Sequence, residues 1–142
     1  MVTVQQVFDM AIHLMDEQDE NNGATTHVDT NEYRFRTINI LNLAIPMLWP
    51  FCTNNDSKEP GRELPNMLDP TPLNNPDFSQ YLPVDDAFSY GVLPYFLAAE
   101  LLLDEDIDRS QMLKNKFDMA FAQIRRSEIA AWEQIENPFW TI

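Results

Sequence analysis

The sequence is poor in cysteine, glycine and positive charge. Its one cysteine, Cys52, cannot form a disulfide within the chain, which is typical of proteins in a reducing compartment. Three glycines are too few for a glycine-rich phosphate-binding loop. Nine Lys and Arg stand against 23 Asp and Glu, so the chain lacks the basic surface that binds DNA phosphates or anionic lipids. We therefore expect no sequence-specific nucleic acid and no membrane among its partners.

Long apolar runs are also missing. No stretch reaches the roughly 18 residues that a membrane span requires. Residues 1–20 lack the basic start and apolar run of a secretory signal. The 142 residues, 44% of them hydrophobic, suit one folded domain with its own core. The expectation is a single cytoplasmic domain over residues 1–142.

Apolar residues recur at helical spacing in four segments, at about residues 4–18, 30–48, 84–103 and 109–135. Three of these segments open with a capping box, in which two side chains each bind an exposed amide of the other's residue. The boxes pair Thr3 with Gln6, Asp29 with Glu32, and Asp108 with Gln111. The Asn-Asn-Gly of residues 21–23 is expected as the stop signal after the first helix.

The third helix and the loop before it differ from the rest. Residues 88–103 are apolar almost all round, which predicts the most buried helix, and Gly91 and Pro94 predict a kink in it. Residues 50–83 hold seven of the ten prolines and are expected to form an irregular loop. The predicted fold is all-α, a small four-helix bundle with this long Pro-rich loop between helices two and three and a tail over 136–142.

Few residues suggest chemistry. Asp9, His13 and Glu17 share one helix face, but the Glu-x-x-His spacing of bundle metal sites is missing, so a solvated acidic face is the preferred interpretation. His27 is expected to be an exposed loop histidine. Cys52 has no basic neighbour that would lower its pKa, which favours a structural thiol.

Three alternating acids resemble the start of a calcium-binding loop. They are Asp104, Asp106 and Asp108. The match fails where Arg109 replaces the glycine at the sixth position and Asn115 the glutamate at the twelfth. A charged turn between two helices is the better interpretation. We predict no catalytic residue, no metal ligand and no cofactor, although tertiary contacts alone can also assemble a reactive site.

The most notable apolar residues lie beyond the last predicted helix. They are Pro138, Phe139, Trp140 and Ile142. Aromatic side chains outside a core are enriched at interfaces and act as anchors, so these four are the candidate interface. The alternative is a tail that folds back over its own bundle.

Three segments resemble small structural proteins of prophages from Gram-positive bacteria. They read VTVQQVFDMAIHLMDE, DTNEYRFRTINILNLAIPML and LPVDDAFSYGVLPYFLAAELLLDED. That group is similar to the head-tail connector, or adaptor, proteins of long-tailed phages. The resemblance covers the predicted helices.

The resemblance implies a helical bundle that packs with further copies into a homo-oligomeric ring beneath the portal and joins head to tail. Such a protein is not an enzyme, needs no cofactor, assembles in the cytoplasm and ends in the virion, with the portal and tail-completion proteins as partners. Its acidic surface is compatible with a DNA conduit, because like charge lets the duplex pass. The family's functional surfaces correspond to residues 50–83 and 136–142.

Two other functions remain open from the sequence. One is a non-enzymatic protein-binding or regulatory module of a phage or bacterium, whose loop captures a partner. The other is a small metal-dependent enzyme that uses Asp9, His13 and Glu17. Metal analysis and the melting temperature with and without a chelator test for the metal-dependent enzyme, because a bound metal stabilises the folded state.

Overall fold

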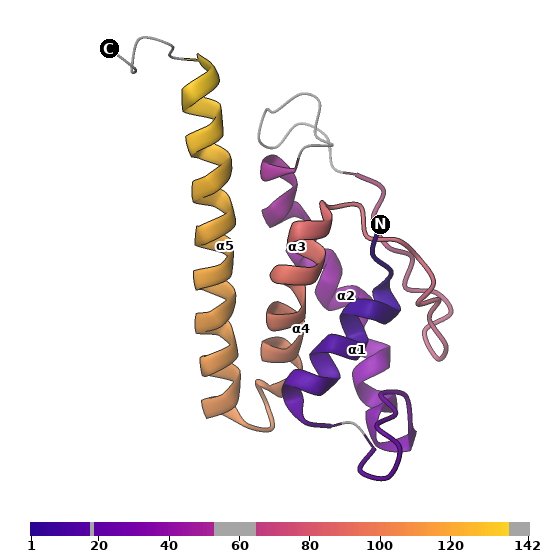
Figure 1. Ribbon diagram of the computed structural model, residues 1–142. Coiled ribbons are helices and arrows are strands. Elements are labelled where there is room, and N and C mark those ends of the chain that lie inside the picture. The colour runs from indigo at the N-terminus through magenta and orange to yellow at the C-terminus, as the bar shows by residue number, and fades with distance from the viewer. Residues whose placement is uncertain (18, 53–64, 137–142) are drawn as a thin grey trace.

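The computed structural model describes residues 1–17, 19–52 and 65–136, with side chains up to Ile124 (Figure 1). Its elements are helices: α1 (Val4–Met15), η1 (Val28–Thr30), α2 (Asn31–Leu48), η2 (Trp49–Phe51), α3 (Asp86–Gly91), α4 (Leu93–Leu102) and α5 (Ile107–Glu136). Within these residues the extended backbone is limited to an isolated antiparallel bridge between Thr3 and Tyr81. The predicted all-α class is confirmed.

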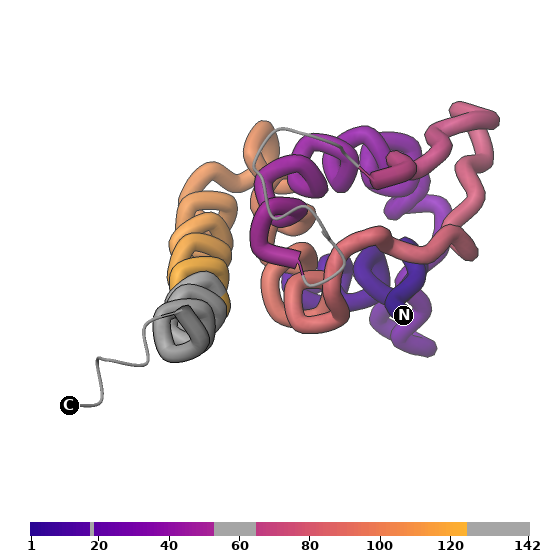
Figure 2. Tube along the Cα trace, turned by 90° about the horizontal axis from the view of Figure 1, so that it is seen from above, coloured from indigo at the N-terminus to yellow at the C-terminus, as the bar shows by residue number. Residues whose placement is uncertain are grey.

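Helix α4 is the centre of the arrangement. It packs against α5 on one side and against α1 and α2 on the other, as the views along two directions agree (Figures 1 and 2). Its buried side chains are Leu93, Pro94, Leu97, Ala98, Ala99, Leu101 and Leu102. A helix that is apolar on every side needs neighbours on every side, which is why it lies in the middle.

Every backbone amide in the first turn of α1 donates a hydrogen bond. The Thr3–Gln6 capping box is confirmed, since the Gln6 amide donates to Oγ1 of Thr3 and the Thr3 amide donates to Oε1 of Gln6. The amides of Val4 and Gln5 donate to the carbonyls of Gln80 and Phe78, both at 2.9 Å. The first turn is therefore tied to a segment distant in sequence, which satisfies donors that a helix cannot satisfy itself.

Helix α1 ends earlier than predicted, at Met15 instead of residue 18. Asp16 adopts the left-handed conformation, with φ 59° and ψ 40°, and its amide donates to the carbonyl of His13. The Glu17 amide donates to the carbonyl of Ile12 at 3.1 Å, which completes a Schellman motif. The expected stop at Asn21-Asn22-Gly23 is wrong, because an aspartate reaches the left-handed conformation first.

Helix α2 begins without the predicted Asp29–Glu32 capping box. Asp29 lies inside η1, whereas a capping residue needs extended backbone. The Thr30 hydroxyl instead accepts from the His27 amide at 3.0 Å and donates to the Thr25 carbonyl at 2.8 Å. Its hydrogen bonds thus close the preceding loop and do not cap the helix.

The predicted third helix is two helices. Gly91 ends α3, and Val92, with φ -125° and ψ -50°, separates it from α4. Pro94 has no amide hydrogen and its ring clashes with the carbonyl four residues earlier, so it is tolerated only in the first turn of a new helix. The expected kink is therefore a complete break.

Helix α5 begins two residues before the prediction. Asp106 caps it, with Oδ1 accepting from the Arg109 amide at 3.2 Å. The predicted Asp108–Gln111 box is wrong, because Asp108 already lies inside the helix. The helix is continuous from Ile107 to Glu136.

Residues 65–85 have irregular backbone and cover the outside of α1 and α2 (Figure 1). Leu68 is held by Asn42, whose side chain both accepts from the Leu68 amide and donates to its carbonyl, each at 3.0 Å. Phe78 packs edge-on against Phe8, with ring centroids 5.2 Å apart. Hydrogen bonds and one aromatic anchor take the place of regular structure here.

Candidate functional site

The candidate interface residues Pro138, Phe139, Trp140 and Ile142 lie outside the described residues.

Asp9, His13 and Glu17 do not form a site. The Asp9 carboxylate accepts from Nε2 of Gln5 at 2.7 Å and from the Thr25 hydroxyl at 2.6 Å, which turns it towards the loop before α2. His13 is exposed and faces α3 and α4. Among the described residues no group of three His, Cys, Asp or Glu side chains is placed to hold a metal ion.

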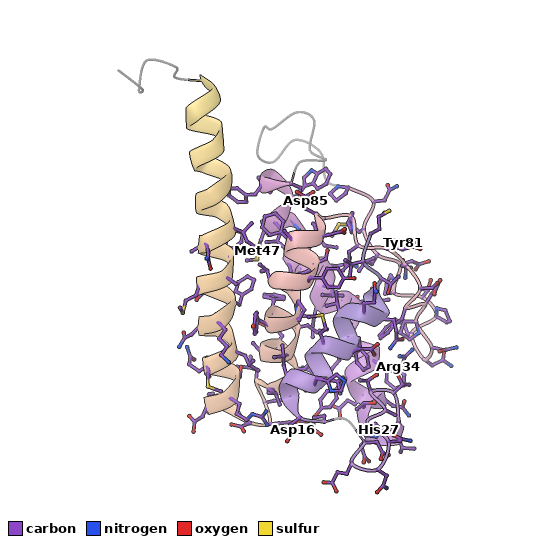
Figure 3. The ribbon with its side chains drawn as sticks, in the orientation of Figure 1. Asp16, His27, Arg34, Met47, Tyr81 and Asp85 are labelled. Atoms are coloured by element: carbon purple, nitrogen blue, oxygen red, sulfur yellow. The ribbon has the colours of Figure 1, made fainter. Side chains whose placement is uncertain are left out.

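The prediction that His27 is exposed is wrong, because its side chain is only 19% exposed. Nε2 lies 2.8 Å from the carbonyl of Glu17, and Nδ1 lies 4.0 Å from the Asp29 carboxylate. The ring thus closes the loop between α1 and η1. Asp16 and His27 lie at the same end of the molecule (Figure 3).

That end is strongly acidic, since residues 16–32 and 100–108 contain no Lys or Arg. Arg109 links the two segments to α1 by donating to the Leu14 carbonyl at 3.1 Å. The Tyr33 hydroxyl donates to the Glu105 carboxylate at 2.5 Å. Burial and this hydrogen bond raise the pKa of the Tyr33 phenol above its ordinary value.

The remaining two candidates are structural. Asp104 and Asp106 lie in the turn between α4 and α5, as expected, and Asp106 caps α5, whereas Asp108 lies inside the helix. Cys52 is completely buried, and its thiol donates to the Leu48 carbonyl at 3.4 Å.

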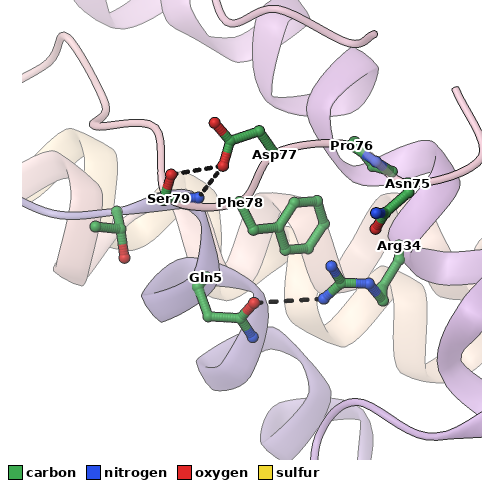
Figure 4. Close-up of a pocket in the computed structure, with 8 residues that line it drawn as sticks. Gln5, Arg34, Asn75, Pro76, Asp77, Phe78 and Ser79 are labelled. Carbon is green, nitrogen blue, oxygen red and sulfur yellow. Dashed lines mark hydrogen bonds between the residues drawn. The ribbon is translucent and has the colours of Figure 1, made fainter. Parts of the chain in front are cut away.

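Sequence reasoning missed Arg34, which lies in an open hollow of about 650 Å³ between α1, α2 and residues 75–79 (Figure 4). Its guanidinium stacks 4.1 Å from the centroid of the Phe78 ring and donates to Oε1 of Gln5 at 3.3 Å. Burial lowers the pKa of Arg34. In this hollow the Asp77 carboxylate is already bound by the amide and hydroxyl of Ser79.

The arrangement around Arg34 fastens residues 75–79 to the helices. A cation held over an aromatic face is stabilising, and the two long bonds of Arg34, to Gln5 and Thr26, fix its direction. Asp77 and Phe78 come from a stretch with no helical or strand pattern. In the sequence, Arg34 is noticeable only as an arginine on an otherwise uncharged helix face. That pattern does not show that Phe78 is its partner.

A second hollow has a different character. It measures about 380 Å³ and lies between α1 and the α3–α4 break. Its lining is Met10, His13, Leu14, Tyr90, Gly91, Pro94 and Tyr95. In this acidic protein the lining contains no carboxylate, so the hollow suits an apolar or aromatic side chain.

Helix α2 also presents apolar side chains outward. Phe35, Leu43 and Met47 share the face opposite the core and are 46%, 68% and 45% exposed. Apolar groups gathered on one surface mark protein contacts more often than scattered ones do. None of the described helices combines the length and apolarity needed to cross a membrane.

Comparison of the chain with models of protein families, with characterised proteins and with solved structures finds no match. The described residues thus define a helical protein whose distinctive features are surfaces for contact: an apolar pocket, an apolar helix face and an acidic end. Function has to be argued from those surfaces and from the resemblance in the sequence.

Proposed function

We propose that this protein is a non-enzymatic structural protein of a phage or prophage, a head-tail connector that joins the portal to the tail in virion assembly. The observation that carries the proposal is where the three connector-like segments lie. They form α1, η1 with α2, and α3 with α4. These helices pack around α4, so the resemblance falls on the part of the chain that makes the core.

The proposed architecture is a helical bundle in which α3 and α4 together take the place of the predicted third helix, with one long Pro-rich loop before them, and its copies stand side by side as a ring. Its partners are the portal and tail-completion proteins, and it passes from the cytoplasm into the virion. The exposed Phe35, Leu43 and Met47 on α2 support contacts of this kind, because apolar and aromatic groups form the centres of interfaces.

Charge supports the same function. The formal net charge of -14 repels the phosphates of a duplex, so DNA leaving the head passes the ring without binding to it. The acidic end around Asp16 and His27 provides a surface for a basic neighbour. Contacts made there weaken as salt is added, because exposed charges are screened.

The proposal is tested by co-expressing the full chain with the portal protein encoded beside its gene. We expect a complex that survives size exclusion and whose mass by light scattering shows several copies per portal. Absence of portal and capsid genes from the neighbourhood, or persistent failure to bind the portal, contradicts the proposal. The lack of a complete ring in isolation does not, because contacts between copies that are weak by themselves need the portal to hold the ring together.

A matched pair of variants locates the contact. Leu43→Glu places a charge in the outward face of α2, where Leu43 is 68% exposed. Leu103→Glu makes the same change at a site 54% exposed at the end of α4. We expect the first to weaken the complex and the second to leave it intact.

A protein-binding or regulatory module is the second candidate. The apolar pocket between α1 and the α3–α4 break favours it, because such pockets accept single anchoring side chains of a partner. Regulatory or host genes in place of portal and capsid genes beside it would support this alternative.

A further inference from the structure

The break between α3 and α4 creates the apolar pocket. Because the helix stops at Gly91 and restarts at Leu93, Tyr90 and Tyr95 stand apart and leave Met10 of α1 partly uncovered. Met10 is 38% and Tyr90 is 45% exposed, so the pocket opens to solvent. Its volume of about 380 Å³ has room for one aromatic side chain.

The lining selects the chemistry of the occupant. The floor is apolar, and the polar groups at its edge are the His13 ring and the hydroxyls of Tyr90 and Tyr95. Without a carboxylate the pocket offers no negative charge to a basic side chain, although acids dominate the rest of the surface. A tryptophan or phenylalanine, with an apolar body and at most one polar hydrogen, fits this lining.

We propose that the pocket receives Trp140, from the aromatic pair Phe139–Trp140 of a second copy of this chain. The inference rests on the proposed function, in that it assigns a contact between neighbouring copies of the ring. The chain carries its own aromatic pair in the sequence just beyond α5, which ends at Glu136. Each copy then supplies one anchor and one pocket, which is a head-to-tail contact that closes into a ring when the rotation allows.

The length of α5 argues against occupation by the chain's own tail. Ile124 lies level with the pocket, since its Cδ1 is 3.7 Å from where a Cβ on Gly91 would stand. Glu136 is about 18 Å further along the helix, at ~1.5 Å per residue. Trp140 follows four residues later, and a fully extended chain of that length spans at most about 14 Å.

The backbone of Trp140 in the same chain therefore stops short of the pocket along the helix axis. The tail would also have to cross the distance from α5 to the pocket perpendicular to the helix axis. The axes of packed helices lie roughly 8–10 Å apart, and α4 lies between α5 and α1. A neighbouring copy has no such restriction. The occupant assigned by this geometry is the tail of another copy.

Cross-linking distinguishes the two sources. We would mix full-length Met10→Cys protein with full-length Trp140→Cys protein, each retaining the buried Cys52, under mild oxidation. The expected product is a mixed disulfide dimer, well above the amount formed when Met119→Cys replaces Met10→Cys. Met119 is 73% exposed on the outward side of α5 and is the matched control.

A chain that carries both Met10→Cys and Trp140→Cys tests the own-tail alternative. When it is oxidised at increasing dilution, we expect less of the disulfide between copies to form, without a disulfide within the chain taking its place. An intrachain disulfide at high dilution overturns the proposal. So does a mixed dimer no more abundant than in the Met119→Cys control.

Variants measure the energetic coupling. Sedimentation equilibrium of the full chain is expected to show self-association that Met10→Glu and Trp140→Ala each weaken at least roughly tenfold, as losses at a central anchor do. The double variant is expected to lose no more than either single one, because both remove the same contact. Additive losses, or equal weakening by Met119→Glu, overturn the proposal.

The outcome is separable from that of the proposed function. A Met10–Trp140 cross-link without any binding to the portal supports the contact and contradicts the connector. Portal binding by a protein that forms no such cross-link supports the connector and overturns the contact.

Discussion

The helices around α4 and the irregular residues 65–85 are held in place by different forces. Leu97 and Leu101 of α4 are completely buried among other apolar side chains, and their positions follow from packing in all directions. Leu68 and Phe78 of the irregular segment are also buried. Their places depend in addition on named hydrogen bonds, such as those from Asn42 and those to the first turn of α1.

The difference shows how non-periodic chain is positioned in a helical protein. A helix satisfies its own backbone groups in its interior and needs neighbours only for its apolar side chains. Residues 65–85 lack that internal pairing, so amides and carbonyls must find partners on the helices. We expect substitutions in the core to lower the free energy of unfolding because they leave a cavity. Substitutions at residues 65–85 and their partners should lower it because they remove hydrogen bonds.

The largest effect is expected from Leu97→Ala. Truncating a completely buried leucine removes apolar contacts and leaves a cavity, which costs about 3 to 4 kcal/mol of unfolding free energy. Urea unfolding measures it. Leu103→Ala, at a position 54% exposed, is the control and should change stability by less than about 0.5 kcal/mol. Equal losses for the two would contradict the central place of α4.

The next largest effect is expected from Asn42→Ala, which should lower the free energy of unfolding by about 2 kcal/mol because it removes both hydrogen bonds to Leu68. Hydrogen exchange at the Leu68 amide should accelerate with it. Asn39→Ala on the exposed face of the same helix should leave both readouts nearly unchanged. Slow exchange at Leu68 in the Asn42 variant would mean that the segment does not depend on these bonds.

Tyr33→Phe keeps the buried ring and removes the bond to Glu105, at a cost of about 1.5 kcal/mol near neutral pH. Because the pKa of Tyr33 is raised on folding, its stabilisation is fully present below the ordinary tyrosine pKa of about 10 and is lost as pH rises above it. Stability measured from pH 8 upward should therefore fall more steeply for the wild type than for the variant. Parallel curves would refute this role.

The smallest of these effects is expected from Asp106→Ala, at about 1 kcal/mol, through loss of the cap on α5. Asp108→Ala provides the comparison, because Asp108 lies inside the helix and caps nothing. Thermal unfolding of both variants decides between the capping residue of the structure and the one expected from the sequence. A larger loss for Asp108→Ala would reverse the assignment.

Local signals predicted some features of the chain and missed others. The Thr3–Gln6 capping box was found because both partners lie three residues apart in one turn. The Asp108–Gln111 pair was wrongly predicted as a capping box. Two residues with the same spacing also occur inside a helix, and here Asp106 already caps α5. His27 and Arg34 were misjudged or missed because their partners, Glu17 and Phe78, lie outside any repeating pattern.

The sequence alone determined that this chain is helical, acidic and built around one helix that is apolar on all sides, because period and charge are local properties. Tertiary structure decided where residues 65–85 lie, that Gly91 and Pro94 divide a helix, and that the division opens an apolar pocket free of carboxylates. Those outcomes depend on which distant groups meet. Directional bonds and the shape of a gap between helices arise only when the chain has folded.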